Sequence, residues 1–251
     1  AGLSNYNNLL NSQLFIQSLK NIFFIWLIGG VIIFFFSILF AVILTSGVKL
    51  KSFFRSIIYL PNVVSAVAMA TMWIHYVYNS KYGLLKSIFS LLHLDELAAM
   101  QWTSPNNIFM ALVIAYSFGM VGYFMLIFMA GIERIPSDFY EAATIDGANI
   151  FQQFFYITLP LLTDVIRTNI VLWTINAIGF FVWSQLFSPL IPETGTITPM
   201  VYMYQEVFGG NTVVLERNVG NGAAVGVILT LIIVLSFIIT NILFKDKKIE
   251  F

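Results

Sequence analysis

The sequence predicts an all-α, polytopic bundle of membrane-spanning helices. Of its 251 residues, 59% are hydrophobic and only 10% are charged, and the mean hydropathy is +0.88. Soluble domains carry about 25% charged residues, so this chain has too little polar surface to cover a globule in water. The second observation is a series of long charge-free runs, since a helix of about 20 apolar residues crosses the hydrocarbon core of a bilayer.

Five such runs predict five spans in a single transmembrane domain that occupies residues 1–251. The first run contains Phe34, Phe35 and Phe36 within nearly continuous Ile, Leu and Phe. The fourth is the most polar, and its charge-free part extends from Thr168 to Pro192. The predicted spans are 21–48, 56–79, 107–132, 161–190 and 218–244.

Lysines and arginines between the spans predict which side of the membrane each loop faces, because cytoplasmic loops carry an excess of positive charge. The larger group is assigned to the cytoplasm. This orientation places Ala1 outside, and residues 1–19 show no cleavable-signal pattern, so we expect the natural protein to have a further helix before Ala1. The cytoplasmic group is Lys49, Lys51, Arg55, Arg134, Arg167, Lys245, Lys247 and Lys248; the outer group is Lys20, Lys81, Lys86 and Arg217.

Composition also excludes several kinds of site. The net charge is zero, so no nucleic-acid-binding surface is predicted. There is no cysteine, and the two histidines, His75 and His93, are too few for a histidine metal cluster. No convergent set of titratable groups marks a catalytic site. We therefore predict no catalytic residue and no metal site, and a membrane-embedded enzyme is the weakest alternative.

Residues 132–160, between the third and fourth spans, form a segment that we name the inner loop and predict to be structured. Residues 136–138 (Pro-Ser-Asp) are typical of a helix start. Gly147 can adopt the left-handed conformation that ends a helix. Asn149 can cap a second helix, with Gln152 three residues later as in a capping box. The pattern predicts two short helices on the cytoplasmic side.

The second of these helices is rich in aromatic residues, and we expect Pro160 to start the next span. One interpretation is a helix pair that lies on the bilayer; the other is a docking surface for a cytoplasmic protein. Acidic residues outnumber the single Arg134, and anionic lipids would repel them, so docking is favoured. The aromatic residues are Phe151, Phe154, Phe155 and Tyr156; the acidic residues are Glu133, Asp138, Glu141 and Asp146.

At these positions the sequence resembles a known family. Glu141-Ala142-Ala143, then Gly147, then Ile157-Thr158-Leu159-Pro160 are similar to the EAA signature of binding-protein-dependent ABC importer permeases. Asp146-Gly147-Ala148 is typical of their carbohydrate branch, the maltose-type permeases. The resemblance covers essentially the whole chain.

The resemblance implies the type I ABC importer permease fold and a place in a larger assembly. A second permease subunit, which we expect to differ from this one, would complete the pathway, and an extracellular lipoprotein or periplasmic binding protein would deliver the substrate to the outer loops. Two ATPase subunits would bind beneath, with the inner loop in a cleft of one of them. The ATPase-coupling residues so implied are Glu141, Ala142, Ala143, Asp146 and Gly147.

We expect ATP to be bound and hydrolysed by the separate ATPase subunits and not by this chain. The chain has no Gly-x-x-x-x-Gly-Lys-Ser/Thr phosphate loop, so we expect it to bind no cofactor, whereas ATP and Mg²⁺ are implied for the ATPase. An ion-coupled secondary transporter is an alternative that would need carboxylates near the middle of the spans. Asp164, which we expect to pair with Arg167, lies at the end of the fourth predicted span, far from its middle.

Polar and aromatic residues within the spans predict where a substrate passes. Trp173, Asn176 and Phe180 share a helix face, where rings could stack on a sugar and the amide could bind hydroxyls; Ser117 and Tyr123 offer similar chemistry. Counted from the EAA signature, the resemblance places these five near the sugar-contacting positions of maltose-type permeases. Ordinary helix packing is the alternative. We expect import of a sugar or oligosaccharide, or alternatively of glycerol phosphate esters, across a bacterial cell membrane.

Overall fold

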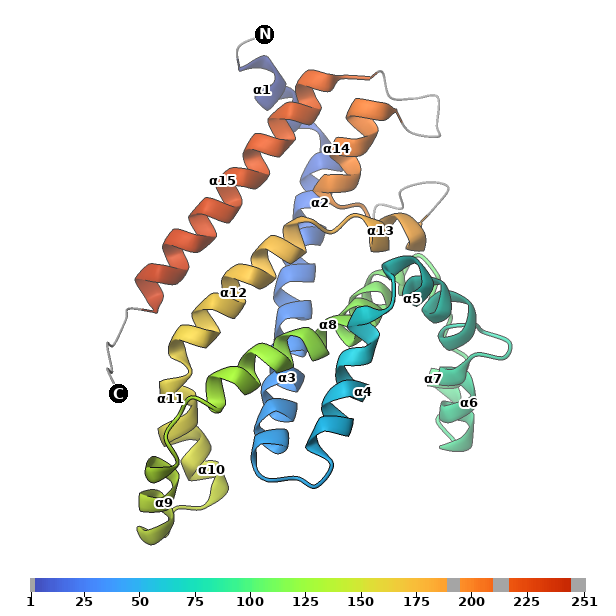
Figure 1. Ribbon diagram of the computed structural model, residues 1–251. Helices are drawn as coiled ribbons and strands as arrows, with labels where there is room; N and C mark the ends of the chain where they lie inside the picture. Colours follow the sequence, from blue (N-terminus) through green and yellow to red (C-terminus); the bar gives the residue numbers. More distant parts are fainter. Residues whose placement is uncertain (1–2, 189–194, 210–216, 245–251) are drawn as a thin grey trace.

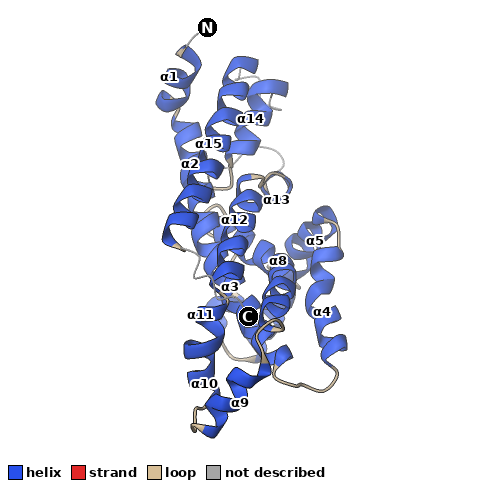
Figure 2. Ribbon diagram, turned by 60° about the vertical axis from the view of Figure 1, so that its left-hand side comes forward, coloured by secondary structure: helices blue, strands red, loops and turns tan. Residues whose placement is uncertain are grey.

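The computed structural model describes residues 3–188, 195–209 and 217–244. Within these ranges every regular element is helical, as Figure 2 shows. The predictions that involve residues 189–192 and Lys245, Lys247 and Lys248 lie outside the described residues.

The first span belongs to a continuous helix of 33 residues, Gln13–Thr45. It begins earlier than the predicted 21–48 because the Ser12 hydroxyl accepts a hydrogen bond from the backbone nitrogen of Phe15, which caps the helix. It ends earlier too, ahead of Gly47, whose φ of +90° is left-handed. The elements are α1 (Ser4–Asn11), α2 (Gln13–Phe24), the π-helical turn η1 (Ile25–Gly29) and α3 (Gly30–Thr45).

The second predicted span, 56–79, is not one straight helix. Two helices, Lys51–Val63 and Ala66–Val77, meet at an angle of 97°. The bend arises because Val64 is extended and the Ser65 hydroxyl caps a new helix by accepting from the nitrogen of Ala68. The elements are α4 (Lys51–Val63), α5 (Ala66–Met72) and the π-helical turn η2 (Trp73–Val77).

Beyond this bend the chain forms two short helices and then the central span. The central span, Ile108–Ile132, closely matches the predicted 107–132, and most of it is buried. In Figure 1 it crosses α3 near the middle of the bundle. The elements are α6 (Leu84–Leu91), α7 (Asp95–Ala98) and α8 (Ile108–Ile132).

The inner loop and the fourth span form a second bent pair. Helices Ile150–Leu161 and Thr163–Ile178 meet at 68°. Pro160 therefore lies in the last turn of the inner-loop helix instead of starting the span, and the π-helical turn before it accommodates its missing N–H. The elements are α9 (Ser137–Ile145), α10 (Ile150–Gln153), η3 (Phe154–Thr158), α11 (Leu159–Leu161) and α12 (Thr163–Ile178).

The predicted fourth span, 161–190, is also shorter than expected. Its long helix stops at Ile178, before Gly179, and the short α13 (Val182–Phe187) follows. The last two described helices are α14 (Pro199–Phe208) and α15 (Val219–Leu243), of which the latter agrees with the predicted 218–244.

By length and composition, three described helices can each cross a membrane, and up to five spans result if each bent pair counts as one. Helix α8 packs against α3, α4 and α12, which makes it the centre of the main core. A second core joins α1 and α2 to α14 and α15 at the end of the bundle opposite the inner loop (Figure 1). Helix α15 is mostly exposed on the outside of the bundle.

Candidate functional site

The inner loop contains both helices that the sequence predicts. Helix α9 ends in a Schellman motif: the nitrogen of Ala148 bonds to the carbonyl of Ala143 at 2.8 Å, and that of Gly147 bonds to the carbonyl of Thr144 at 3.0 Å. Gly147 has φ +79°, the left-handed conformation that this motif requires. The predicted helix stop at Gly147 is confirmed.

The second helix starts with the predicted capping box. The side chain of Asn149 accepts from the nitrogen of Gln152 at 2.9 Å, and the side chain of Gln152 accepts from the nitrogen of Asn149 at 2.8 Å. Two backbone donors at the helix start are thereby satisfied. The chain thus reverses between α9 and α10 over the four residues 146–149, where the predicted glycine stop and the predicted capping box both form.

Side-chain bonds hold the two helices together as one body. Tyr140 Oη and Thr158 Oγ1 lie 3.0 Å apart and join α9 to the end of η3. Gln153 Nε2 donates to Thr144 Oγ1 at 3.0 Å and to the carbonyl of Ala148 at 3.3 Å. Figure 1 shows this helical hairpin projecting below the rest of the bundle.

The tip of the inner loop exposes apolar side chains to its surroundings. Five large ones are between 56% and 86% exposed, although burying such groups is what normally stabilises a fold. Of the residues predicted to contact an ATPase, Glu141, Ala142, Asp146 and Gly147 are exposed and Ala143 is half-buried. The exposed apolar residues are Ile145, Ile150, Phe151, Phe155 and Tyr156.

A groove of about 660 Å³ separates the inner loop from the carboxyl end of α3. The turn between α3 and α4 contributes Ser46 and Gly47 to one wall, and the inner loop contributes Glu133, Tyr140 and Phe154 to the other. The hairpin therefore stands partly clear of the bundle on this side.

The predicted pathway residues do not form one exposed surface. Trp173 and Phe180 are buried, and both pack against Tyr116, with ring centroids 6.0 Å and 4.6 Å away. Ser117 is also buried but lines a different groove, next to Trp73.

Two of the five retain some exposure. Asn176 is half-buried, and its amide nitrogen donates to the carbonyl of Leu172 in its own helix at 2.8 Å. Tyr123 is half-buried as well and stacks edge-on against Phe124. In this conformation Trp173 and Phe180 pack in the core, whereas Asn176 and Tyr123 are partly exposed and can contact a substrate.

Residues that the sequence reasoning missed surround Trp173. A Cβ built on Gly30 would lie only 2.6 Å from the indole nitrogen of Trp173, so that ring fills the space that the glycine leaves. Thr174 accepts a hydrogen bond from Trp26 Nε1 at 2.9 Å. The adjacent pair Gly29-Gly30 inside an apolar run was the signal that could have shown a close helix contact.

Asp164 and Arg167 form the expected ion pair, with Nη2 and Oδ1 3.4 Å apart. Arg167 also donates to the carbonyl of Phe244, where α15 ends, at 3.5 Å. A cation at the carboxyl end of a helix is favourable, so Arg167 joins the amino-terminal part of α12 to the carboxyl end of α15.

Comparisons with known proteins agree with this arrangement. Residues 22–248 match the family model described as "Binding-protein-dependent transport system inner membrane component". The chain is 33% identical to the "Probable ABC transporter permease protein YesP" of Bacillus subtilis over 251 residues, covering 98% of this chain and 77% of the relative. It is 33% identical to the "Arabinooligosaccharides transport system permease protein AraP" of Halalkalibacterium halodurans, covering 92% of this chain and 71% of the relative.

The fold has a solved counterpart. A chain from the crystal structure of a bacterial ABC transporter involved in the import of the acidic polysaccharide alginate superposes with a TM-score of 0.83 at 20% identity, covering 99% of this chain and 85% of that one. This similarity confirms the predicted importer-permease fold. With the family match over nearly its whole length, the chain belongs to the family of binding-protein-dependent transport system inner membrane components.

Proposed function

We propose that this chain forms half of the translocation pathway of an ATP-driven importer and that its inner loop couples the pathway to a separate ATPase. The observation that carries the proposal is the braced hairpin of α9 and α10, which exposes Ile145, Ile150, Phe151, Phe155 and Tyr156 at its tip. In a chain that spans a membrane, an apolar tip held clear of the bundle needs a protein surface to cover it.

Charge supports a protein partner over the bilayer surface. Glu141 and Asp146 are exposed on the hairpin, and neither has an ion-pair partner within the described residues. Exposed carboxylates beside apolar groups suit a cleft that supplies arginine or lysine, whereas anionic lipids would repel them. Glu141, Ala142, Ala143, Asp146 and Gly147 are the residues we assign to this contact.

The rest of the assembly follows from the family. A second permease subunit of similar fold would complete the pathway as a heterodimer, two ATPase subunits would bind ATP and Mg²⁺, and an extracellular binding protein would deliver the substrate. In support, one solved structure of similar fold is a bacterial alginate ABC transporter in complex with an alginate pentasaccharide-bound periplasmic protein. We assign the chain to a bacterial cell membrane, with no cofactor or metal of its own.

An oligosaccharide is the substrate class we propose. Relatives are named for arabinooligosaccharides, diacetylchitobiose and trehalose or maltose. Lysine and arginine in the described spans lie toward the helix ends, at Lys20, Lys51, Arg55 and Arg167, so nothing there neutralises a phosphate ester near mid-membrane. Within the pathway, Asn176 and Tyr123 are the residues best placed to meet a sugar in this conformation, ahead of Ser117, Trp173 and Phe180.

Reconstitution tests the proposal. The chain, its partner permease and the ATPase are placed in vesicles with the binding protein, and oligosaccharide uptake is measured with ATP and with a proton or sodium gradient. We expect uptake to require ATP hydrolysis and to survive ionophores. Uptake driven by an ion gradient without the ATPase would overturn the proposal in favour of a secondary transporter.

A further inference from the structure

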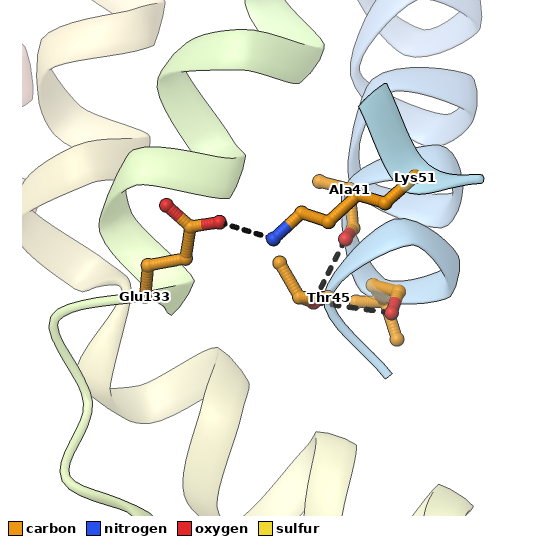
Figure 3. Close-up of polar contacts among 5 residues, drawn as sticks. Ala41, Thr45, Lys51 and Glu133 are labelled. Carbon is orange, nitrogen blue, oxygen red and sulfur yellow. Dashed lines mark hydrogen bonds and ion pairs between the residues drawn. The ribbon is translucent and has the colours of Figure 1, made fainter. Parts of the chain in front are cut away.

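A lysine and a glutamate far apart in sequence meet at the cytoplasmic side of the bundle, outside the hairpin just described. Lys51 Nζ donates a hydrogen bond to Glu133 Oε1 at 2.5 Å, and the two residues are 82 positions apart in the sequence. Figure 3 shows the pair bridging from the start of α4 to the end of α8. Lys51 is the first residue of α4, and Glu133 follows directly after the last residue of α8, where the inner loop leaves the span.

The turn that carries Lys51 is locally unfavourable. Leu50 has φ +61°, a left-handed conformation that any side chain with a Cβ disfavours. Leu50 is also the N-cap residue of α4 and provides no side-chain cap. A turn with a strained residue and an uncapped helix start persists only when contacts elsewhere hold it, and Lys51 makes such a contact.

The two charges are placed to join neighbouring helices. The helix dipole disfavours a cation at the amino end of a helix and an anion at the carboxyl end. Lys51 at the start of α4 and Glu133 at the end of α8 are therefore each unfavourable for their own helix. Each is favourable toward the other helix, because the amino end of α4 lies beside the carboxyl end of α8. Their positions therefore suit a contact between helices and not the capping of either one.

This contact is singular in the part of the chain that the structure describes. Among the described residues, Lys51 is the one member of the segment 46–51 with a polar contact to residues 133–158. The groove of about 660 Å³ separates the other residues of these two segments. Helix α4 itself has no buried residue. Its backbone lies close against α8 at Gly122, where an added Cβ would come within 2.3 Å of the carbonyl of Ile58.

We propose that Lys51 and Glu133 are positioning residues that transmit movement of the inner loop to α4. Helix α4 is attached to α8 at Gly122 and, at its cytoplasmic end, to Glu133 of the inner loop. A displacement of the loop by its ATPase then moves Glu133, and the ion pair carries Lys51 and the uncapped start of α4 with it. The inference rests on the proposed function, because it requires that the inner loop be the element the ATPase displaces.

Charge reversal separates this role from simple stabilisation of the helix ends. In the reconstituted importer, oligosaccharide uptake per ATP hydrolysed is measured for K51E, E133K and the double variant K51E/E133K. We expect each single variant to lose coupling about 5- to 10-fold, the low end of the roughly 5- to 150-fold range typical of coupling between sites, while ATPase association persists. The double variant restores the pair with the charges exchanged and should return to within about twofold of the wild type.

If Lys51 and Glu133 only affected the stability of their own helix ends, the single variants should behave in the opposite way. K51E alone puts an acid at the amino end of α4 and E133K alone puts a base at the carboxyl end of α8, and both changes complement the helix dipole. Single variants that couple as well as the wild type would overturn the inference. So would a double variant that stays as low as the singles, since the pair itself would then be irrelevant.

Controls keep this outcome distinct from failure of the proposed function. K49E makes the same charge change on an exposed neighbour of the same turn and should leave coupling unchanged. K51Q and E133Q replace the charge-reversal variants if a reversed charge prevents membrane insertion. Each should also lower coupling, because each removes the ion pair. Absence of ATP-driven uptake in the wild type would contradict the proposed function; a normal wild type with insensitive pair variants would contradict only this inference.

Discussion

The indole nitrogen of Trp173 donates a hydrogen bond to the backbone carbonyl of Trp26, 2.8 Å away. The neighbouring residue returns the contact, because Thr174 accepts from Trp26 Nε1. Trp26 lies in the π-helical turn η1, next to Gly29 and Gly30, against which the Trp173 ring packs. Helix α12, which leaves the inner loop through a 68° bend, is therefore hydrogen-bonded to the first long helix at this position. A movement of the hairpin that rotates α12 must act against this contact.

Gly30→Ala tests the contact between α3 and Trp173. The new methyl group would lie 2.6 Å from the indole nitrogen, so the ring must shift and its bond to Trp26 is lost. We expect about 1–3 kcal/mol of destabilisation, seen as a lower melting temperature in detergent. Gly119→Ala is the matched control, since its Cβ would meet only Trp183 at 3.9 Å. Equal melting temperatures for both variants would contradict the close packing.

Glu141→Lys tests coupling without disturbing the fold. Glu141 is exposed, and surface substitutions of this kind usually change stability by less than about 0.5 kcal/mol. We expect normal membrane insertion and melting temperature, but uptake reduced at least about tenfold because the reversed charge repels the basic residue that we propose in the ATPase cleft. Glu141→Gln should have a smaller effect. Full uptake by inserted Glu141→Lys would show that this carboxylate has no part in coupling.

Gly147→Ala tests the geometry of the hairpin. No atom lies within 4 Å of the position of the new Cβ, so the cost comes from the left-handed backbone alone, about 1 kcal/mol. We expect the reversal between α9 and α10 to loosen and uptake to fall severalfold. Gly147→Asn should stay near the wild type, because asparagine tolerates this conformation best among the other residues. Uptake that falls equally for alanine and asparagine would point to a contact at Gly147 instead of backbone strain.

Asn176→Ala and Trp173→Phe distinguish pathway from packing. If Asn176 binds sugar hydroxyls, alanine should raise the KM for uptake about tenfold, equivalent to about 1.4 kcal/mol, with little change in melting temperature. Trp173→Phe removes a buried hydrogen bond and should instead lower stability by about 1 kcal/mol with an unchanged KM. Measuring the KM for uptake and the melting temperature of both variants shows which residue contacts the substrate and which one packs in the core. A KM effect confined to Trp173 would reverse the assignment made from burial.

The parts of the structure that were predictable from sequence depend on local interactions. Gly147, Asn149 and Gln152 specify the hairpin because each bonds to backbone within a few residues. The central span, 108–132, was equally clear because its apolar run contains no charged residue and is followed directly by Glu133 and Arg134.

The parts that were missed depend on contacts between distant segments. The 97° bend depends on Ser65 capping a new helix, a signal too weak on its own to outweigh the apolar run around it. Trp173 and Asn176 lie on α12 as predicted, but the predicted face with Phe180 is wrong, because the helix ends at Ile178 before Gly179. Spacing also could not tell whether these residues meet the core or a pathway. The Lys51–Glu133 pair joins residues 82 positions apart, and no local pattern reveals it.

The most direct test of the central claim is crosslinking from the tip of the hairpin. The chain contains no cysteine, so Phe151→Cys introduces a unique attachment point for a photoreactive label on an exposed apolar residue of α10. In the assembled importer we expect this label to capture the ATPase subunit, whereas the same label at Leu92→Cys, exposed between α6 and α7, should not. Capture of lipid alone from position 151, with the ATPase present and active, would contradict the account.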